Sequence, residues 1–247
     1  MGQYDGKRVV ITGGTSGIGF ATAKLLLDQG ARVLITGRKK AALDSVAKEL
    51  GKNTIAVESD AASLADIDRL ADRVKSEFGT IDLLYVNAGI TRFMPFESMT
   101  DAVYDEIFTV NAKGPYFTVQ KLAPLISQGG AVVVTTSVVN EMGYPMISAY
   151  SASKAALRSM VRSLARELLP RGVRVNAVSP GPIETGILDR SLPTEAVGQT
   201  KQAMIEENPM RRFGRPEEVA RAVAYLAFEA TYTTGSELAV DGGGSQL

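Results

Sequence analysis

Seven short strand-like runs, separated by stretches with helical periodicity, constrain the fold of this chain more than any other feature. Several runs are continuously apolar, as expected of strands that are buried on both faces. Between them, apolar residues recur at i, i+3 and i+4, as in the stretch from Leu157 to Leu168. This alternation predicts an α/β fold with a doubly wound parallel sheet and helices on both faces. The predicted strands are Arg8–Thr12, Arg32–Thr36, Thr54–Glu58, Leu83–Asn87, Ala131–Thr136, Arg174–Val178 and Glu237–Val240.

The length of 247 residues fits one large domain, because α/β domains often run to about 250 residues. No linker, repeat or low-complexity run divides the chain, so residues 1–247 are expected to form a single domain. The least regular region is 182–208, where Pro, Gly, Thr and Ser stand between apolar residues. This composition predicts a mobile substrate flap that contains one short helix.

The charge balance gives no reason to expect a nucleic-acid partner, since Lys plus Arg and Asp plus Glu both number 27. Arg158, Arg162 and Arg166 form a stripe at i+4 spacing, which we interpret as a solvated or subunit-facing helix face. No segment is long enough to span a membrane, and the first residues resemble no signal peptide. A cytoplasmic protein without membrane contact is therefore expected.

Histidine and cysteine are both absent, which excludes several kinds of site. The chain cannot form a Ser-His-Asp triad, a His-ligated metal site, a thiol nucleophile or a disulfide, and no metal site is predicted. Acid–base chemistry would then depend on Tyr, Lys, Asp or Glu. Tyr150 and Lys154 are four residues apart and share a helix face. The ammonium is expected to favour the phenolate and to lower the pKa of Tyr150 from about 10.

A glycine-rich segment lies between the first predicted strand and the helix that follows. Gly13, Gly17 and Gly19 stand in Thr-Gly-Gly-Thr-Ser-Gly-Ile-Gly, which begins at Thr12. Small residues allow the backbone to turn tightly and to approach a pyrophosphate, whose charge a helix N-terminus favours. A glycine pattern alone can be a structural turn, but its place in a βαβ unit predicts dinucleotide binding.

The residues after the second predicted strand bear on which dinucleotide is bound. An acidic residue there would bind the ribose 2′-hydroxyl, whereas an arginine accommodates a 2′-phosphate. This chain has Gly37 in place of the acid, followed by Arg38, Lys39 and Lys40. The alternative is a solvated charge run at a helix start. The sequence favours NADP(H) over NAD(H).

Together, these segments resemble the short-chain dehydrogenase/reductase family, in its single-domain branch. The order and spacing of further motifs match the family over nearly the whole chain: Asn87-Ala88-Gly89, Asn111-Ala112-Lys113-Gly114, Ser137, Pro180-Gly181-Pro182 and Val240-Asp241-Gly242-Gly243. The resemblance implies a seven-stranded Rossmann sheet and an NAD(P)-dependent oxidoreductase that acts on CH–OH groups or their carbonyls. It also implies a homotetramer, with the Tyr150 helix and the last strand at interfaces.

The resemblance implies a role for each residue of a catalytic set. Tyr150 would be the general acid in carbonyl reduction, and Ser137 would hydrogen-bond the substrate oxygen. Lys154 would bind the nicotinamide ribose and favour the tyrosinate. Asn111 would hold a water that links Lys154 to solvent.

The resemblance also implies a set of cofactor-binding residues. Within it, Asp60 matches the position that touches adenine, and Thr12 matches one that supports the glycine loop. The full set is Thr12, Gly13, Thr15, Ser16, Gly17, Ile18, Gly19, Arg38, Lys39, Asp60, Ala61, Asn87, Ala88, Gly89, Tyr150, Lys154, Pro180, Gly181, Ile183 and Thr185.

The residues that follow the catalytic segments are mostly apolar, which favours a small-molecule ketone or aldehyde with hydrophobic substituents. The apolar candidates are Val138, Val139, Met142, Met94, Phe96, Tyr144, Ile187 and Leu188, and the polar exceptions are Asn140, Glu141 and Glu184.

Three other functions stay open. A 3-oxoacyl-[acyl-carrier-protein] reductase would need basic surface for an acidic carrier, but the turn expected at Ile126–Gly130 has no cation and only Arg171 is a candidate contact. An NAD-dependent alcohol, polyol or steroid dehydrogenase would run in the oxidative direction. A non-catalytic cofactor-sensing regulator would be expected to lose the Tyr or the Lys, and this chain retains both.

Overall fold

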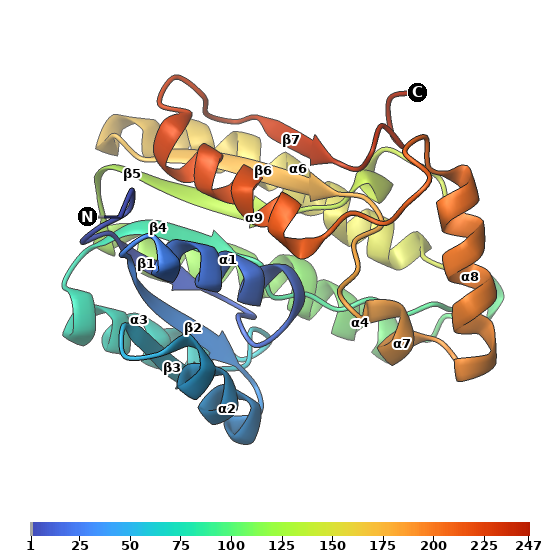
Figure 1. The fold of residues 1–247 in the computed structure, drawn as a ribbon, viewed down its shortest axis with the longest axis horizontal. Coiled ribbons are helices and arrows are strands. Elements are labelled where there is room, and N and C mark those ends of the chain that lie inside the picture. Colours follow the sequence, from blue (N-terminus) through green and yellow to red (C-terminus); the bar gives the residue numbers. More distant parts are fainter. Residues whose placement is uncertain (1) are drawn as a thin grey trace.

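A parallel sheet of seven strands runs through the centre of the molecule, in the order β3-β2-β1-β4-β5-β6-β7 (Figure 1). The computed structural model describes residues 2–247. All neighbouring strands pair in parallel, and the order reverses between β1 and β4. The strands are β1 (Arg8–Ile11), β2 (Arg32–Gly37), β3 (Thr54–Glu58), β4 (Ile81–Val86), β5 (Ile126–Thr135), β6 (Arg174–Pro180) and β7 (Glu237–Val240).

Helices cover both faces of the sheet, as the sequence predicts. Successive strand residues point to opposite faces, so Val9 and Ile11 pack in one core cluster with α1 and α9, whereas Val10 packs in another with α3, α5 and α6. The helices are α1 (Gly17–Asp28), α2 (Lys40–Leu50), α3 (Leu64–Phe78), α4 (Asp101–Phe108), α5 (Gly114–Leu122), α6 (Ser148–Leu168), α7 (Ile187–Ser191), α8 (Thr194–Glu207) and α9 (Pro216–Ala224). Within residues 2–247, no helix has the length and apolar character needed to cross a bilayer.

Two strand predictions are corrected by the structure. β4 begins at Ile81 rather than Leu83, and β5 begins at Ile126 rather than Ala131. The residues expected to form a turn before the fifth strand instead form an irregular start of β5, where the pairing with β4 shifts register. The signal was hidden because Gly129 and Gly130 resemble a turn, and Gly129 indeed has a left-handed φ of 82°.

Region 182–208 is more regular than its composition predicts. It holds α7 and the 14-residue α8 rather than one short helix. Thr194–Glu207 is rich in Glu, Gln, Ala and Met, which are good helix formers, and Pro193 immediately precedes it. Both helices lie beyond the carboxyl ends of the strands (Figure 1).

Gly114, at the start of α5, is required by a close backbone contact. A Cβ added there would lie 2.0 Å from the carbonyl oxygen of Ala61, in the segment that follows β3. We therefore expect Gly114→Ala to lower the free energy of unfolding by about 1–3 kcal/mol through overpacking. Urea denaturation measures this loss.

Gly198→Ala in α8 is the matched control, because the added methyl meets no described heavy atom within 4 Å. It is expected to leave stability unchanged or to raise it by about 0.4–1 kcal/mol. Equal stability of the two variants would contradict the packing argument for Gly114.

Candidate active site

A cavity of about 1020 Å³ lies at the carboxyl ends of the strands. Segments that follow β1 through β6 all contribute to its wall, together with α7, α8 and the start of α6. A crevice at the point where the strand order reverses is where open α/β sheets bind ligands.

The glycine loop lines one side of this cavity through Gly13 and Gly17, which have left-handed φ values of 67° and 55°. Gly19 lies behind the loop, because a Cβ there would be 2.3 Å from the Gly13 carbonyl oxygen. Thr12 supports the loop from below: its Oγ1 accepts hydrogen bonds from the amides of Asn87 at 3.0 Å and Ala88 at 3.1 Å. Thr12 and Gly19 therefore shape the cavity without lining it.

The N-terminus of α1 opens into the same cavity. Ser16 precedes the helix in an extended conformation, and its side chain caps none of the described backbone amides. Thr15, Ser16, Gly17 and Ile18 line the cavity. Free amides at a helix N-terminus, beside a loop where side chains would clash, fit the pyrophosphate of a dinucleotide.

Arg38, Asp60 and Ala61 line the adenosine end predicted for this cofactor. Asp60 also stabilises its own turn, because its Oδ1 accepts from the amide of Ala62 at 2.9 Å. Lys39 was predicted to bind the cofactor, but it is exposed and is not among the lining residues.

Ser137, Tyr150 and Lys154 meet in the wall of the cavity. Ser137 follows β5, and the other two lie on successive turns of α6. The Ser137 hydroxyl lies close enough to the Tyr150 phenol to act on its pKa. The buried Lys154 Nζ donates to the carbonyl oxygen of Thr135 at 2.8 Å and lies 5.7 Å from the centroid of the Tyr150 ring.

The predicted direction of the Tyr150 pKa is wrong for this structure. Burial raises the pKa of the Tyr150 phenol, and the neighbouring Ser137 hydroxyl opposes that rise without cancelling it. Burial also lowers the pKa of Lys154, to about 8. Both shifts disfavour the charged forms, and this desolvation outweighs the attraction that the i, i+4 spacing suggested.

Asn111 lies behind the cavity in a π-helical turn, Thr109–Lys113, and is fully buried. Its amide binds both backbone groups of Ile90 at 2.9 Å and donates to Ser153 Oγ at 3.1 Å. Asn111 Oδ1 and Lys154 Nζ lie 3.3 and 3.6 Å from the point that a Gly89 Cβ would occupy. Glycine at position 89 therefore leaves room beside both polar groups.

A buried polar network, which was not predicted from the sequence, lies beneath the predicted catalytic residues. Thr135 Oγ1 hydrogen-bonds the Tyr85 hydroxyl at 2.8 Å and Asn87 Oδ1 at 3.3 Å. Asn87 Nδ2 in turn donates to the carbonyls of Thr12 and Gly13. The network therefore links the end of β5, where the Thr135 carbonyl accepts from Lys154, to the glycine loop. A tyrosine and a threonine in otherwise apolar buried strands were the available signal.

The segment that follows β6 forms the remaining wall of the cofactor end, through Pro180, Gly181, Ile183 and Thr185. Gly181 packs against the residue that follows β7, since a Cβ there would lie 2.8 Å from the Cα of Asp241. Asn87, Ala88 and Gly89, which follow β4, also line the cavity.

Only some of the residues predicted for the substrate end line the cavity. Six of the candidates line the cavity: Val138, Val139, Met142, Tyr144, Ile187 and Leu188. Met94 and Phe96 do not, and the Phe96 side chain is 77% exposed. The lining residues that were not predicted include Met204, because α8 was expected to be irregular, and Phe213, which follows that helix.

The polar exceptions also lie outside this cavity. Asn140 donates to Glu237, and Glu184 pairs with Lys201 at 3.0 Å. Besides Arg38, Asp60 and Lys154, the charged residues that line the cavity are Arg92, Arg190 and Glu207. Arg92 is already paired with Glu106 at 2.6 Å.

Comparisons with known proteins agree with this architecture. Residues 13–245 match the model of a family described as enoyl-(acyl carrier protein) reductase. The chain is 42% identical to oxidoreductase asL5 of Sarocladium schorii, covering 99% of this chain and 98% of that protein. It is 37% identical to 3-oxoacyl-[acyl-carrier-protein] reductase FabG of Thermotoga maritima, covering 98% of both.

Two further relatives extend the comparison. The chain is 37% identical, over 96% of each protein, to an L-rhamnose 1-dehydrogenase (NAD(P)(+)) of Azotobacter vinelandii. A crystal structure of a short-chain dehydrogenase/reductase from Brucella melitensis superposes with a TM-score of 0.92 at 31% identity, covering 98% of each chain. The chain belongs to the short-chain dehydrogenase/reductase family of nicotinamide-dependent oxidoreductases.

Proposed function

We propose that this protein is an NADPH-dependent reductase of ketones or aldehydes with hydrophobic substituents. One observation carries the proposal: Ser137, Tyr150 and Lys154 meet in a single cavity whose glycine-loop end fits a dinucleotide and whose other end is mostly apolar. Substrate orientation in such a cavity depends on a few polar groups among apolar walls.

Each catalytic residue has a role that its surroundings support. The bound nicotinamide supplies the hydride. Tyr150 donates the proton to the carbonyl oxygen, and its raised pKa keeps that proton on the phenol near neutral pH. Ser137, whose hydroxyl lies beside Tyr150 in the cavity wall, donates to the same oxygen as negative charge develops on it.

Lys154 and Asn111 complete the set. Lys154 binds the ribose hydroxyls while Thr135 holds its ammonium in place. Asn111 has one lone pair on Oδ1 beyond its bond from Ile90, and this lone pair holds a water that leads toward Lys154.

Arg38 is the proposed contact to the 2′-phosphate of NADPH, since it lines the cavity and Gly37 replaces the acid expected for NADH. Arg38→Ala is expected to weaken the binding of NADPH about 10- to 100-fold, because one charge-assisted hydrogen bond is lost. The binding of NADH should weaken less than about threefold. Titrations that follow nicotinamide fluorescence measure both affinities.

Lys40→Ala is the control for the Arg38 variant. It removes a neighbouring cation that pairs with Asp44 at 3.3 Å rather than lining the cavity. Equal losses of NADPH and NADH in Arg38→Ala, or tighter binding of NADH by the wild type, would overturn the NADPH assignment and move the search toward alcohol and polyol oxidation.

A 3-oxoacyl-[acyl-carrier-protein] reductase is the second candidate, supported by the FabG relative. The basic surface that an acidic carrier protein would need gives this function less support. Arg171 precedes the amino end of β6, whereas the cavity lies at the carboxyl ends of the strands. Its guanidinium donates to the carbonyl of Ala123 at 2.6 Å. Comparing kcat/KM for trifluoroacetophenone and for acetoacetyl thioesters of coenzyme A and of the carrier protein distinguishes the two functions.

A higher kcat/KM for the carrier-bound thioester than for the other two compounds would favour the carrier-protein reductase. We also propose a homotetramer in the cytoplasm, as the family resemblance suggests. Sedimentation equilibrium tests the tetramer, with a monomer as the contradicting result.

A further inference from the structure

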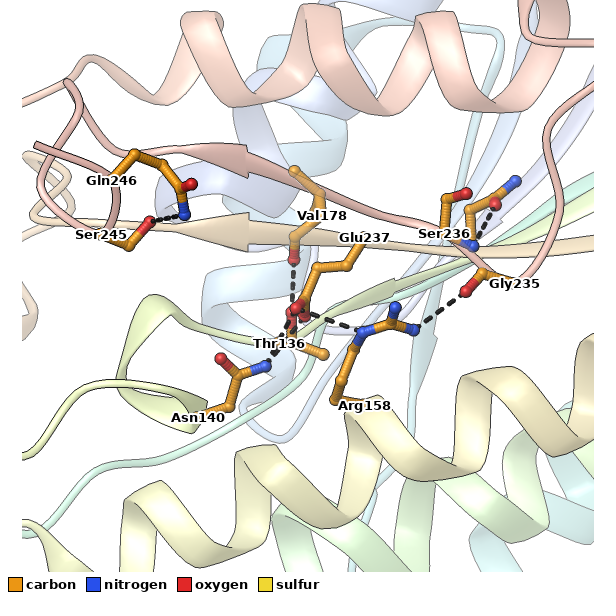
Figure 2. Close-up of polar contacts among 10 residues, drawn as sticks. Thr136, Asn140, Arg158, Val178, Gly235, Ser236, Glu237, Ser245 and Gln246 are labelled. Atoms are coloured by element: carbon orange, nitrogen blue, oxygen red, sulfur yellow. Dashed lines mark hydrogen bonds and ion pairs between the residues drawn. The ribbon is translucent and has the colours of Figure 1, made fainter.

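Glu237, the first residue of β7, connects segments that carry the proposed catalytic side chains (Figure 2). Its carboxylate accepts a hydrogen bond from the Thr136 hydroxyl. Both of its oxygens accept from Asn140 Nδ2, at 3.0 and 3.1 Å. The same carboxylate forms an ion pair with Arg158, whose Nε lies 3.3 Å from Glu237 Oε2.

The partners of this carboxylate flank the catalytic residues in sequence. Thr136 immediately precedes Ser137, and Asn140 ends the short 3₁₀ turn that follows it. Arg158 lies on α6, one helical turn beyond Lys154. The carboxylate thus contacts the Ser137 segment on both sides and the helix that carries the other two catalytic residues.

The cluster is largely removed from solvent. The Glu237 and Arg158 side chains are 10% and 15% exposed. The Arg158 guanidinium also donates to the carbonyl of Gly235 at 3.0 Å, just before β7 (Figure 2). Arg158 was interpreted as part of a solvated or subunit-facing stripe, but its guanidinium is held by Glu237 and Gly235, whereas Arg162 and Arg166 are exposed.

Buried ion pairs are weak sources of stability, because desolvation of both charges offsets most of their attraction. They do fix geometry, because a buried carboxylate that loses a hydrogen bond becomes energetically costly. Here the geometry that is fixed is the distance between the end of β5 and α6.

We propose that Glu237 is a positioning residue, which holds Ser137 against Tyr150 by tying their segments together at the edge of the sheet. The inference rests on the catalytic roles proposed for those two residues. Among residues 2–247, neither of them forms a hydrogen bond with Glu237, so the carboxylate acts through Thr136, Asn140 and Arg158.

Glu237→Gln tests this role, because it keeps the shape of the side chain and removes its charge and one acceptor. We expect kcat for trifluoroacetophenone to fall about 10- to 100-fold, as for a displacement near 1 Å of a reacting group. The KM and the Kd of NADPH should change less than about threefold, since the glycine loop does not contact this cluster. Dideuterated NADPH should give a larger kinetic isotope effect than in the wild type.

Arg174→Lys is the matched structural control. The buried Arg174 guanidinium donates to the carbonyls of Leu226, Ala227 and Ala230, at the end of β6 away from the cavity. This variant should lose thermal stability and keep its kcat at temperatures where it is folded. A comparable kcat loss in both variants would show that Glu237 affects only stability.

A crystal structure of Glu237→Gln provides a measurement that does not depend on turnover. The separation of Ser137 Oγ and the Tyr150 hydroxyl should increase. An unchanged separation, or an unchanged kcat, would overturn the inference. If the variant does not fold, Asn140→Ala and Thr136→Val each remove one donor and are held to the same criteria. A wild type that reduces no ketone would contradict the proposed function, whereas the structure would still decide the role of Glu237.

Discussion

Tyr150→Phe is expected to reduce kcat about 10²- to 10⁴-fold, the usual contribution of a positioned general acid. The substitution removes one hydroxyl and keeps the ring. That ring lies beside Lys154 in the cavity wall, 5.7 Å from its Nζ to the centroid, so packing of α6 should be preserved. The Kd of NADPH should stay within about threefold of the wild type, because the glycine loop and the N-terminus of α1 are untouched.

Steady-state kinetics with trifluoroacetophenone and NADPH measure the first effect, and nicotinamide fluorescence measures the second. Tyr116→Phe is the control, since this tyrosine is 42% exposed and lies outside the cavity wall. Near-normal turnover of Tyr150→Phe would exclude Tyr150 as the proton donor. Loss of NADPH binding in parallel with turnover would indicate that the phenol shapes the cofactor site instead.

The sequence predicts the sheet well because burial on both faces leaves a strong local signal. Runs such as Val9 to Ile11 are continuously apolar and are fully buried in the structure. The prediction was less accurate where a local signal and a long-range contact compete. Gly129 and Gly130 resemble a turn, yet β5 extends back to Ile126 because that residue pairs with Ile81.

In the candidate site, too, local motifs were predicted well and long-range contacts were not. Residues in motifs with fixed spacing, such as Ser137, Tyr150 and Lys154, could be named from the sequence and do meet in one cavity. The direction in which a side chain points could not be predicted from the sequence. Asn140 stands three residues from Ser137 and was a plausible pocket residue, but Glu237, nearly a hundred residues away, draws its amide in another direction.

The burial of the site residues also could not be predicted from their spacing in the sequence. An i, i+4 distance between Tyr150 and Lys154 predicts attraction, but it carries no information on how deeply the two groups are buried. Lys154 is 4% exposed. Desolvation therefore sets the direction of both pKa shifts.

Lys154→Met is expected to reduce kcat/KM at least about 100-fold, because the charge near Tyr150 and the proposed ribose contact are both lost. The variant should also differ from the wild type in the pH dependence of its stability. Burial lowers the pKa of Lys154 from 10.5 to about 8. In the wild type, folding is therefore opposed by the cost of burying the ammonium at a pH below the folded pKa. That cost is relieved as pH rises from the folded toward the unfolded pKa, since the unfolded chain then binds more protons than the native one.

Methionine has no such cost, so the stability of the wild type relative to Lys154→Met should rise by about 2 kcal/mol between about pH 7 and about pH 10. Urea denaturation of both proteins across that range measures the change, which is independent of any constant difference caused by the lost bond to Thr135. Lys113→Met, at an exposed lysine, should show no comparable slope. A flat difference for Lys154→Met would mean that the lysine stays equally charged in both states. Near-normal kcat/KM would remove Lys154 from the catalytic set even if the slope were present, so the two measurements separate the lysine's burial from its role in turnover.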